Sequence, residues 1–91
     1  MYSVGLTPKD VQLKVAAQVK VLRKQAGYSQ AELARRAQVS LGSYKRFEAS
    51  GLIAFDALLR ISFILGRLEA LSTVYELRHQ PDFNKLFQME V

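Results

Sequence analysis

The sequence contains no cysteine, and this absence removes two common ways of stabilising a small domain. Neither a disulfide nor a cysteine-ligated metal site can form, so the 91 residues must depend on one modest hydrophobic core. A chain without cysteine also suits a reducing compartment, and we expect a cytoplasmic protein.

Long apolar runs are lacking as well. No stretch of the sequence approaches the roughly 20 consecutive apolar residues that span a membrane. The opening residues, MYSVGLTPKD, have no basic region followed by an apolar run, so we predict no signal peptide. A membrane is therefore not expected among the partners of this chain.

Residues suited to catalysis or metal binding are scarce. The single histidine, His79, has no cysteine or clear carboxylate cluster beside it, so we interpret it as a surface residue at a helix end. The five glycines are isolated from one another and form no phosphate-binding loop. Ser40 and Ser43 have no histidine or lysine arranged to activate them as nucleophiles. We therefore predict a protein that is not an enzyme and has no cofactor or metal site.

Acidic residues are few in the first half of the chain, which gives this half a strong positive charge. Residues 1–51 contain nine Lys or Arg and three Asp or Glu, a net charge of +6. Residues 52–91 contain four basic and five acidic residues, a net charge of −1. Solvated helix surfaces alone would be the simpler explanation. Because the positive half also holds the motif described next, we interpret it as a surface for nucleic-acid phosphates.

The stretch 29–48, SQAELARRAQVSLGSYKRFE, has the pattern of two short helices joined by a tight turn. Ser29 and Glu32 have the spacing of a capping box, in which each side chain accepts from the backbone N–H of the other residue. Three apolar residues of the first helix share one face: Leu33, Ala34 and Ala37. Ala34 is small where the two helices must cross closely, as a helix-turn-helix requires.

The second helix of this stretch is expected over 41–48, with Ser40 as its N-cap. Tyr44 and Phe47 lie three residues apart and can both face the core. The outward side chains are small, apolar or basic, which suits the helix end that enters a DNA groove. The residues expected to face base edges are Leu41, Gly42, Ser43 and Lys45. The residues expected to hold phosphates are Gln30, Ser40 and Arg46.

This stretch resembles the Cro/CI-type helix-turn-helix family, which includes the phage lambda and 434 repressors. The residues that carry the resemblance are Gln30, Leu33, Ala34, Val39, Ser40, Tyr44, Arg46, Phe47 and Glu48. The similarity extends over about 19–71 and leaves out both ends of the chain. Gln38 departs from the pattern, because many relatives have glycine at this turn and Gln38 must tolerate a left-handed backbone. Leu41 departs too, because it stands where many relatives have a polar base-reading residue.

The resemblance implies an all-α fold, a compact five-helix lambda repressor-like DNA-binding domain with a short C-terminal tail. It also implies a partly buried ion pair between Arg23, near the end of the first helix, and Glu48, at the end of the recognition helix. Such a pair fixes the orientation of the helices, and removal of one member leaves a charge without its counterpart.

Three further helices are predicted from caps and apolar spacing. The first covers 8–26 and is closed by a left-handed cap at Gly27. The fourth covers 55–65, is apolar nearly all round as in a central helix, and ends at Gly66. The fifth covers 68–77. Because the last two have more apolar surface than a small monomer covers, we expect a homodimer through them.

We divide the chain into a DNA-binding domain, residues 1–78, and a C-terminal tail, residues 79–91. Within the tail, Phe83, Leu86 and Phe87 have the i, i+3, i+4 spacing of one helical face. This face can fold back on the domain or bind a protein partner. We expect the fold-back, because terminal apolar residues more often complete a small core.

The sequence thus predicts a sequence-specific repressor of transcription that acts as a dimer on double-stranded operator DNA and regulates its own operon. The alternative is an antitoxin or interaction module that chiefly binds a protein. The stretch 34–66 resembles antitoxins that precede HipA-like kinases, so a toxin of this kind is a candidate partner.

Overall fold

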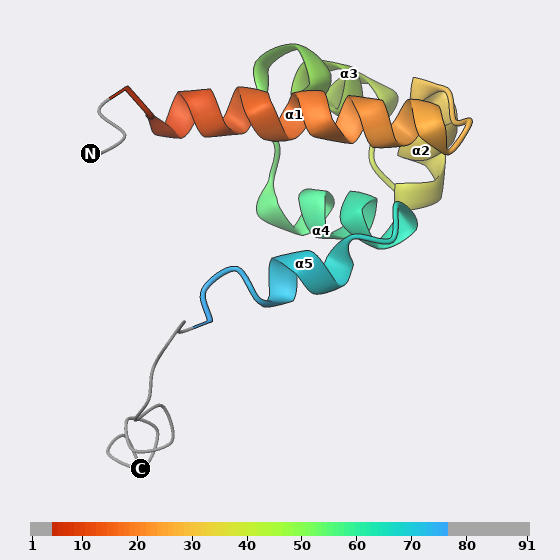
Figure 1. The fold of residues 1–91 in the computed structure, drawn as a ribbon. Helices are drawn as coiled ribbons and strands as arrows, with labels where there is room; N and C mark the ends of the chain where they lie inside the picture. The colour runs from red at the N-terminus through yellow and green to blue at the C-terminus, as the bar shows by residue number, and fades with distance from the viewer. Residues whose placement is uncertain (1–4, 77–91) are drawn as a thin grey trace.

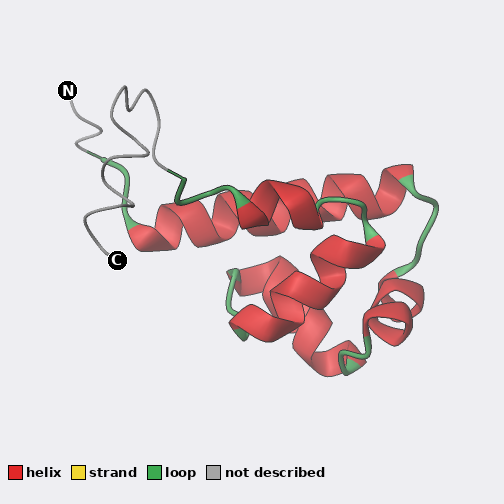
Figure 2. Cartoon of the chain, turned by 90° about the horizontal axis from the view of Figure 1, so that it is seen from below, coloured by secondary structure: helices red, strands yellow, loops and turns green. Residues whose placement is uncertain are grey.

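Five helices follow one another along residues 5–76, the part of the chain that the computed structural model describes (Figure 1). The helices are α1 (Pro8–Gln25), α2 (Gln30–Ala37), α3 (Leu41–Ser50), α4 (Phe55–Ile64) and α5 (Leu68–Ser72). Within these residues there is no strand, and short loops join the helices (Figure 2). The predicted all-α, five-helix fold is therefore confirmed.

Local signals in the sequence set both ends of α1. The Thr7 hydroxyl accepts from the Asp10 N–H at 3.1 Å, and the Asp10 carboxylate accepts from the Thr7 N–H at 3.0 Å. This reciprocal pair satisfies backbone donors that a helix leaves unpaired at its start. The helix ends at Gln25, and Gly27 follows in the predicted left-handed conformation, with φ +82°.

The core lies among α1, α2, α3 and α4. Its buried side chains are Ala16, Val19, Leu33, Ala34, Ala37, Tyr44, Phe47 and Ile61. The rings of Tyr44 and Phe47 meet edge to face with their centroids 6.0 Å apart, so both residues face inward as predicted. Buried Ala34 has the small side chain that close packing of α2 on α3 requires.

The fourth helix differs from the prediction that it lies centrally. It buries only Ala57, Ile61 and Ser62, whereas Phe55 and Phe63 are 68% and 67% exposed. The reason is that α4 packs on α2 and α5 and leaves its remaining sides uncovered. Much of the apolar surface predicted to be in surplus therefore lies on the outside of the described domain.

Helices α1 and α4 each end one residue before the predicted position, and two other helix ends differ by two residues or more. Helix α3 continues past Glu48 to Ser50, and the Ser50 hydroxyl donates to the Arg46 carbonyl at 2.7 Å. It stops there because Gly51 takes a left-handed conformation, with φ +80°. Helix α5 ends at Ser72 instead of continuing over 68–77, and it has no buried residue to stabilise a longer helix.

The approach of α1 to the end of α3 is close at Gly51. A Cβ atom placed there would lie 2.7 Å from the Gln12 carbonyl carbon. The Lys9 ammonium group donates to the Ser50 carbonyl at 2.7 Å and joins the same two helices. Gly51 is thus required twice, by its positive φ and by the neighbouring backbone.

No helix within residues 5–76 is both long enough and apolar enough to cross a bilayer.

We predict that Gly51→Ala destabilises the protein more than Gly27→Ala does. Both glycines have φ near +80°, but nothing lies within 4 Å of a Cβ at Gly27. The left-handed backbone should cost either variant about 1–2 kcal/mol. The clash should add about 1–3 kcal/mol for Gly51→Ala alone. Urea unfolding measures both losses, and equal losses would contradict the close approach.

Candidate nucleic-acid interface

Helices α2 and α3 are joined by a tight turn that local hydrogen bonds define. Gln38 has φ 59° and ψ 42°, the left-handed conformation predicted for it. The Val39 N–H donates to the Ala34 carbonyl at 2.9 Å across the end of α2. Ser40 then caps α3, because its hydroxyl oxygen accepts from the Ser43 N–H at 3.1 Å. The turn therefore directs the N-terminus of α3 away from α2 as a helix-turn-helix does.

The predicted capping box of α2 is only half formed. The Ser29 hydroxyl accepts from the Glu32 N–H at 3.0 Å, but among the described hydrogen bonds Glu32 does not return to the Ser29 N–H. Its carboxylate instead accepts from Arg35 at 2.8 Å and from Arg36 at 2.6 Å. Charge-assisted bonds to two guanidinium groups outweigh one bond to a neutral amide.

A second contact on the turn comes from Arg60 of α4. Its Nε donates to the Ala37 carbonyl at 2.9 Å, and its Nη2 lies 3.5 Å from the Gln38 carbonyl. Asp56 holds the same guanidinium at 2.9 Å through Nη1. Arg60 thus occupies carbonyl groups that have no partner inside α2. The i, i+4 spacing of Asp56 and Arg60 could have suggested their ion pair, but nothing in the sequence pointed to the contact with the turn.

The centre of the unit is the carboxylate of Glu48, which four donor groups contact. Arg23 donates to it through Nε at 2.7 Å and Nη2 at 3.3 Å, so the pair predicted from the sequence lies in contact. The amide of Gln30 donates at 2.9 Å, and the Tyr44 hydroxyl donates to the other carboxylate oxygen. The side chains of Arg23 and Glu48 are only 8% and 6% exposed. One buried carboxylate therefore joins α1, α2 and α3.

The charges in this network favour its ionised form. Burial opposes ionisation of Glu48, but hydrogen bonds from Arg23, Tyr44 and Gln30 outweigh it and lower the pKa of Glu48. The hydrogen bond to Glu48 raises the pKa of Arg23 despite burial. Burial, and then the hydrogen bond to Glu48, raise the pKa of Tyr44 well above its ordinary value. At neutral pH the network therefore contains a carboxylate, a guanidinium and a neutral phenol.

The opposite side of α3 is turned outward. Leu41 is 39% exposed, and Gly42, Lys45 and Arg46 are exposed. Ser43 is half-buried, and its hydroxyl accepts from the Ser40 hydroxyl at 2.9 Å. The four residues expected to read bases therefore share one helix, but Ser43 is already bonded within the protein.

The residues expected to hold phosphates are placed differently from one another. Arg46 is exposed and Ser40 lies at the start of α3, but half-buried Gln30 donates to Glu48. An amide group has two N–H donors, so Gln30 keeps one for a phosphate. The phosphate roles of the three residues stay predictions.

The cations near α3 differ in whether they are neutralised. Arg23 pairs with Glu48, and Arg35 and Arg36 share Glu32. The Arg36 guanidinium also lies over the Tyr28 ring, 4.9 Å from its centroid. By contrast, Lys45 and Arg46 form no salt bridge with any residue in 5–76. Their charge is thus available to an anionic ligand.

Several predicted features lie outside the described residues. These are His79, the tail 79–91 and its residues Phe83, Leu86 and Phe87. Within residues 5–76, no group of three metal-binding side chains is present.

We predict that Glu48→Gln is much more destabilising at pH 7 than at pH 3. Removal of one member of a buried pair typically costs about 3–5 kcal/mol. Because the pKa of Glu48 is lowered in the folded state, its contribution is complete above the unfolded pKa, about 4.3. That contribution is lost as the pH falls through the folded pKa, so the wild-type protein and the variant should then converge.

The control for this experiment is Glu32→Gln, which removes an ionised but far more exposed carboxylate. Urea unfolding at the two pH values measures both variants. We expect a much smaller loss for the control at pH 7. A Glu48→Gln loss that does not change with pH would contradict an ionised network.

Comparison with known proteins agrees with the geometry of α2, the turn and α3. A family model described as a helix-turn-helix domain matches residues 14–80, more than two thirds of the chain. No curated protein and no solved structure matches the chain. The matched residues contain the left-handed turn at Gln38 and the Glu48 network. By this match the chain belongs to the helix-turn-helix domain family.

Proposed function

We propose that the protein is a sequence-specific DNA-binding repressor of transcription that acts as a dimer on operator DNA and regulates its own operon. The observation that carries the proposal is the exposed side of α3, held on a helix-turn-helix and carrying Lys45 and Arg46, which form no salt bridge within residues 5–76. The Cro/CI-type resemblance of the motif supports the same assignment.

The recognition helix α3 is proposed to enter the major groove through its N-terminal part. The side chains that would meet base edges are Leu41, Gly42, Ser43 and Lys45. Exposed Leu41 is suited to the methyl group of thymine. Ser43 would contact a base through whatever hydrogen-bonding capacity its contact with Ser40 leaves. Gln30, Ser40 and Arg46 would contact phosphates and set the register of the helix.

The dimer is proposed to form through the outer side of α4 and α5. Phe63 is 67% exposed, Leu68 39% and Val74 57%. Exposed apolar side chains on consecutive elements favour association with a second copy, since a two-fold interface uses the same patch twice. A dimer of this kind would place two α3 helices about 34–36 Å apart, one turn of DNA.

A second candidate function is favoured by the same exposed apolar surface. In an antitoxin or interaction module, these side chains would bind a protein, such as a HipA-like toxin kinase, instead of a second copy. The two functions are compatible, because an antitoxin can bind both its operator and its toxin.

The proposed repressor is tested by binding to its own promoter and to random DNA of equal length. We expect tighter binding to the promoter and a clearly negative slope of log affinity against log salt concentration, as counterion release requires. Arg46→Ala should weaken binding to all sequences alike, because phosphate contacts carry no sequence information. Lys45→Ala should relax the preference at one base position, by about 1–3 kcal/mol.

Two results would contradict this assignment. Equal affinity for promoter and random DNA, or an affinity that does not depend on salt, would exclude a sequence-specific repressor. If Lys45→Ala changes only the salt slope, Lys45 is a phosphate contact and not a base reader.

Repeating the DNA-binding measurement with the product of the neighbouring gene separates the repressor from the antitoxin, because a protein partner should alter the complex with DNA.

Gly42 allows a separate prediction, in which stability and binding change in opposite directions. Within residues 5–76 no atom lies within 4 Å of a Cβ at this position, and Gly42 has no positive φ. The fold therefore does not require glycine, which costs a helix interior about 0.5–1 kcal/mol relative to alanine. Because Gly42 is the second residue of α3, we expect Gly42→Ala to stabilise the protein by no more than that amount. It should also weaken promoter binding, because a methyl group would obstruct the approach of DNA.

Thermal unfolding and promoter binding of the same Gly42→Ala preparation provide the two readouts. A variant that is more stable and binds the promoter equally well would show that the DNA does not approach α3 at Gly42.

A further inference from the structure

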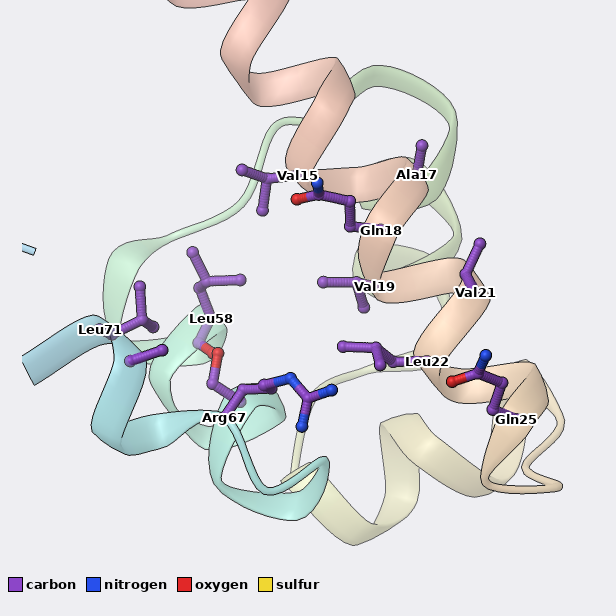
Figure 3. Close-up of a pocket in the computed structure, with 12 residues that line it drawn as sticks. Val15, Ala17, Gln18, Val19, Val21, Leu22, Gln25, Leu58, Arg67 and Leu71 are labelled. Carbon is purple, nitrogen blue, oxygen red and sulfur yellow. The ribbon is translucent and has the colours of Figure 1, made fainter.

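An apolar groove separates α1 from α4 and α5 (Figure 3). From α1, Val15, Val19 and Leu22 point toward Leu58 of α4 and Leu71 of α5. The volume of the groove is about 660 Å³, within the roughly 300–1,000 Å³ of sites that enclose a ligand. Its lining residues come from α1, α4, α5 and the α4–α5 loop, and none comes from α3.

The walls of the groove are incompletely covered. Val15, Leu22, Leu58 and Leu71 are only half-buried, although each presents a branched apolar side chain. Helix α5 packs on α4, and none of its residues is buried. Arg67 is the one charged residue in the lining, and it forms no salt bridge within residues 5–76. The groove therefore suits an apolar segment with an acidic group beside it.

The sequence that follows α5 has this composition. Phe83, Leu86 and Phe87 have the spacing of one helical face, and residues 82–91 also contain two acidic residues, Asp82 and Glu90, and one basic residue. We propose that residues 82–91 bind in the groove of their own chain, with Phe83, Leu86 and Phe87 against α1, α4 and α5. Helix-in-groove contacts use anchors at this spacing.

The length of the connecting chain supports an occupant from the same molecule. Leu71 lines the groove, and the described chain ends only five residues later, at Glu76. Residues 77–82 can then span up to about 20 Å. So short a loop has a small closure entropy, and the tether gives an effective concentration in the millimolar range.

A second groove, between α2 and α4, suits this segment less well. Its volume is about 430 Å³, and Arg36 and Arg60 are both in its lining. Phe63 and Leu68 also line it, so it belongs to the surface assigned above to the dimer. The two grooves lie on different sides of α4, and one segment of the chain and a second copy can occupy them together.

The absence of cysteine permits a direct test on the full-length chain. In a Gln88→Cys variant, a spin label on the single thiol broadens the NMR signals of methyl groups near it. We expect the strongest broadening at Leu22, Leu58 and Leu71 and weaker broadening at Leu41 and Leu52. Mixing spin-labelled protein of natural isotope content with isotope-labelled, unmodified protein shows whether the contact is within one chain. Broadening at the groove that persists in the mixture, or that is absent from the spin-labelled protein itself, would overturn the proposal.

Melting temperatures give a second, independent measurement. The Phe83→Ala/Phe87→Ala double variant should melt lower than the wild-type protein by at least about 5 °C. Asn84→Ala, outside the predicted face, is the matched control and should melt normally. Combined with Leu71→Ala, the double variant should lose less than the sum of the separate losses, because both changes remove one contact.

An unchanged melting temperature of the double variant, or losses that are strictly additive, would reject the contact. These measurements contain no DNA. Their outcome is therefore independent of whether the protein is a repressor.

Discussion

A buried carboxylate must have partners, and the arrangement of the first three helices depends on this constraint at Glu48. An ionised side chain that is 6% exposed is stable only when hydrogen bonds replace the water it has lost. Arg23, Gln30 and Tyr44 supply those bonds from α1, α2 and α3. The helices can satisfy the carboxylate in one relative arrangement, so the network specifies orientation more than it adds stability.

The fourth helix fixes the same unit from the opposite end. Arg60 binds carbonyl groups at the end of α2, where the backbone changes to the left-handed conformation of Gln38. The Glu48 network thus holds one end of the helix-turn-helix and Arg60 holds the turn. Held at both places, α3 presents its outer side chains in a constant geometry, as the proposed contacts with base edges would require.

The surface of the domain is divided according to chemistry. The outward side of α3 has exposed cations that pair with no other residue of the described domain, whereas α1, α4 and α5 leave apolar side chains uncovered. Apolar side chains thus remain uncovered in two grooves, one on each side of α4. In a domain of this size such surface is costly to leave in water, which is why we assign it to a segment of the chain and to a second copy.

Features that depend on neighbours three to five residues apart could be predicted from the sequence alone. The caps at Thr7, Ser29 and Ser40 are local bonds, and the left-handed Gly27 and Gln38 follow from the turns they occupy. These features are local because helix ends leave backbone groups that nearby side chains can reach. The inward spacing of Tyr44 and Phe47 was likewise predictable from helical periodicity.

Which distant groups meet depends on how the helices pack and could not be predicted from local spacing. The Arg23–Glu48 pair, separated by 25 residues, was expected only because the sequence resembles a known family. Gln30 reaches Glu48 across 18 residues, and Arg60 reaches the turn across 23, and neither contact has a signal in the sequence. Such contacts depend on how helices pack, and any exposed polar side chain of suitable length could have made them. The same reason explains why the groove between α1 and α5 is visible only in three dimensions: it is formed by side chains that separate helices leave uncovered.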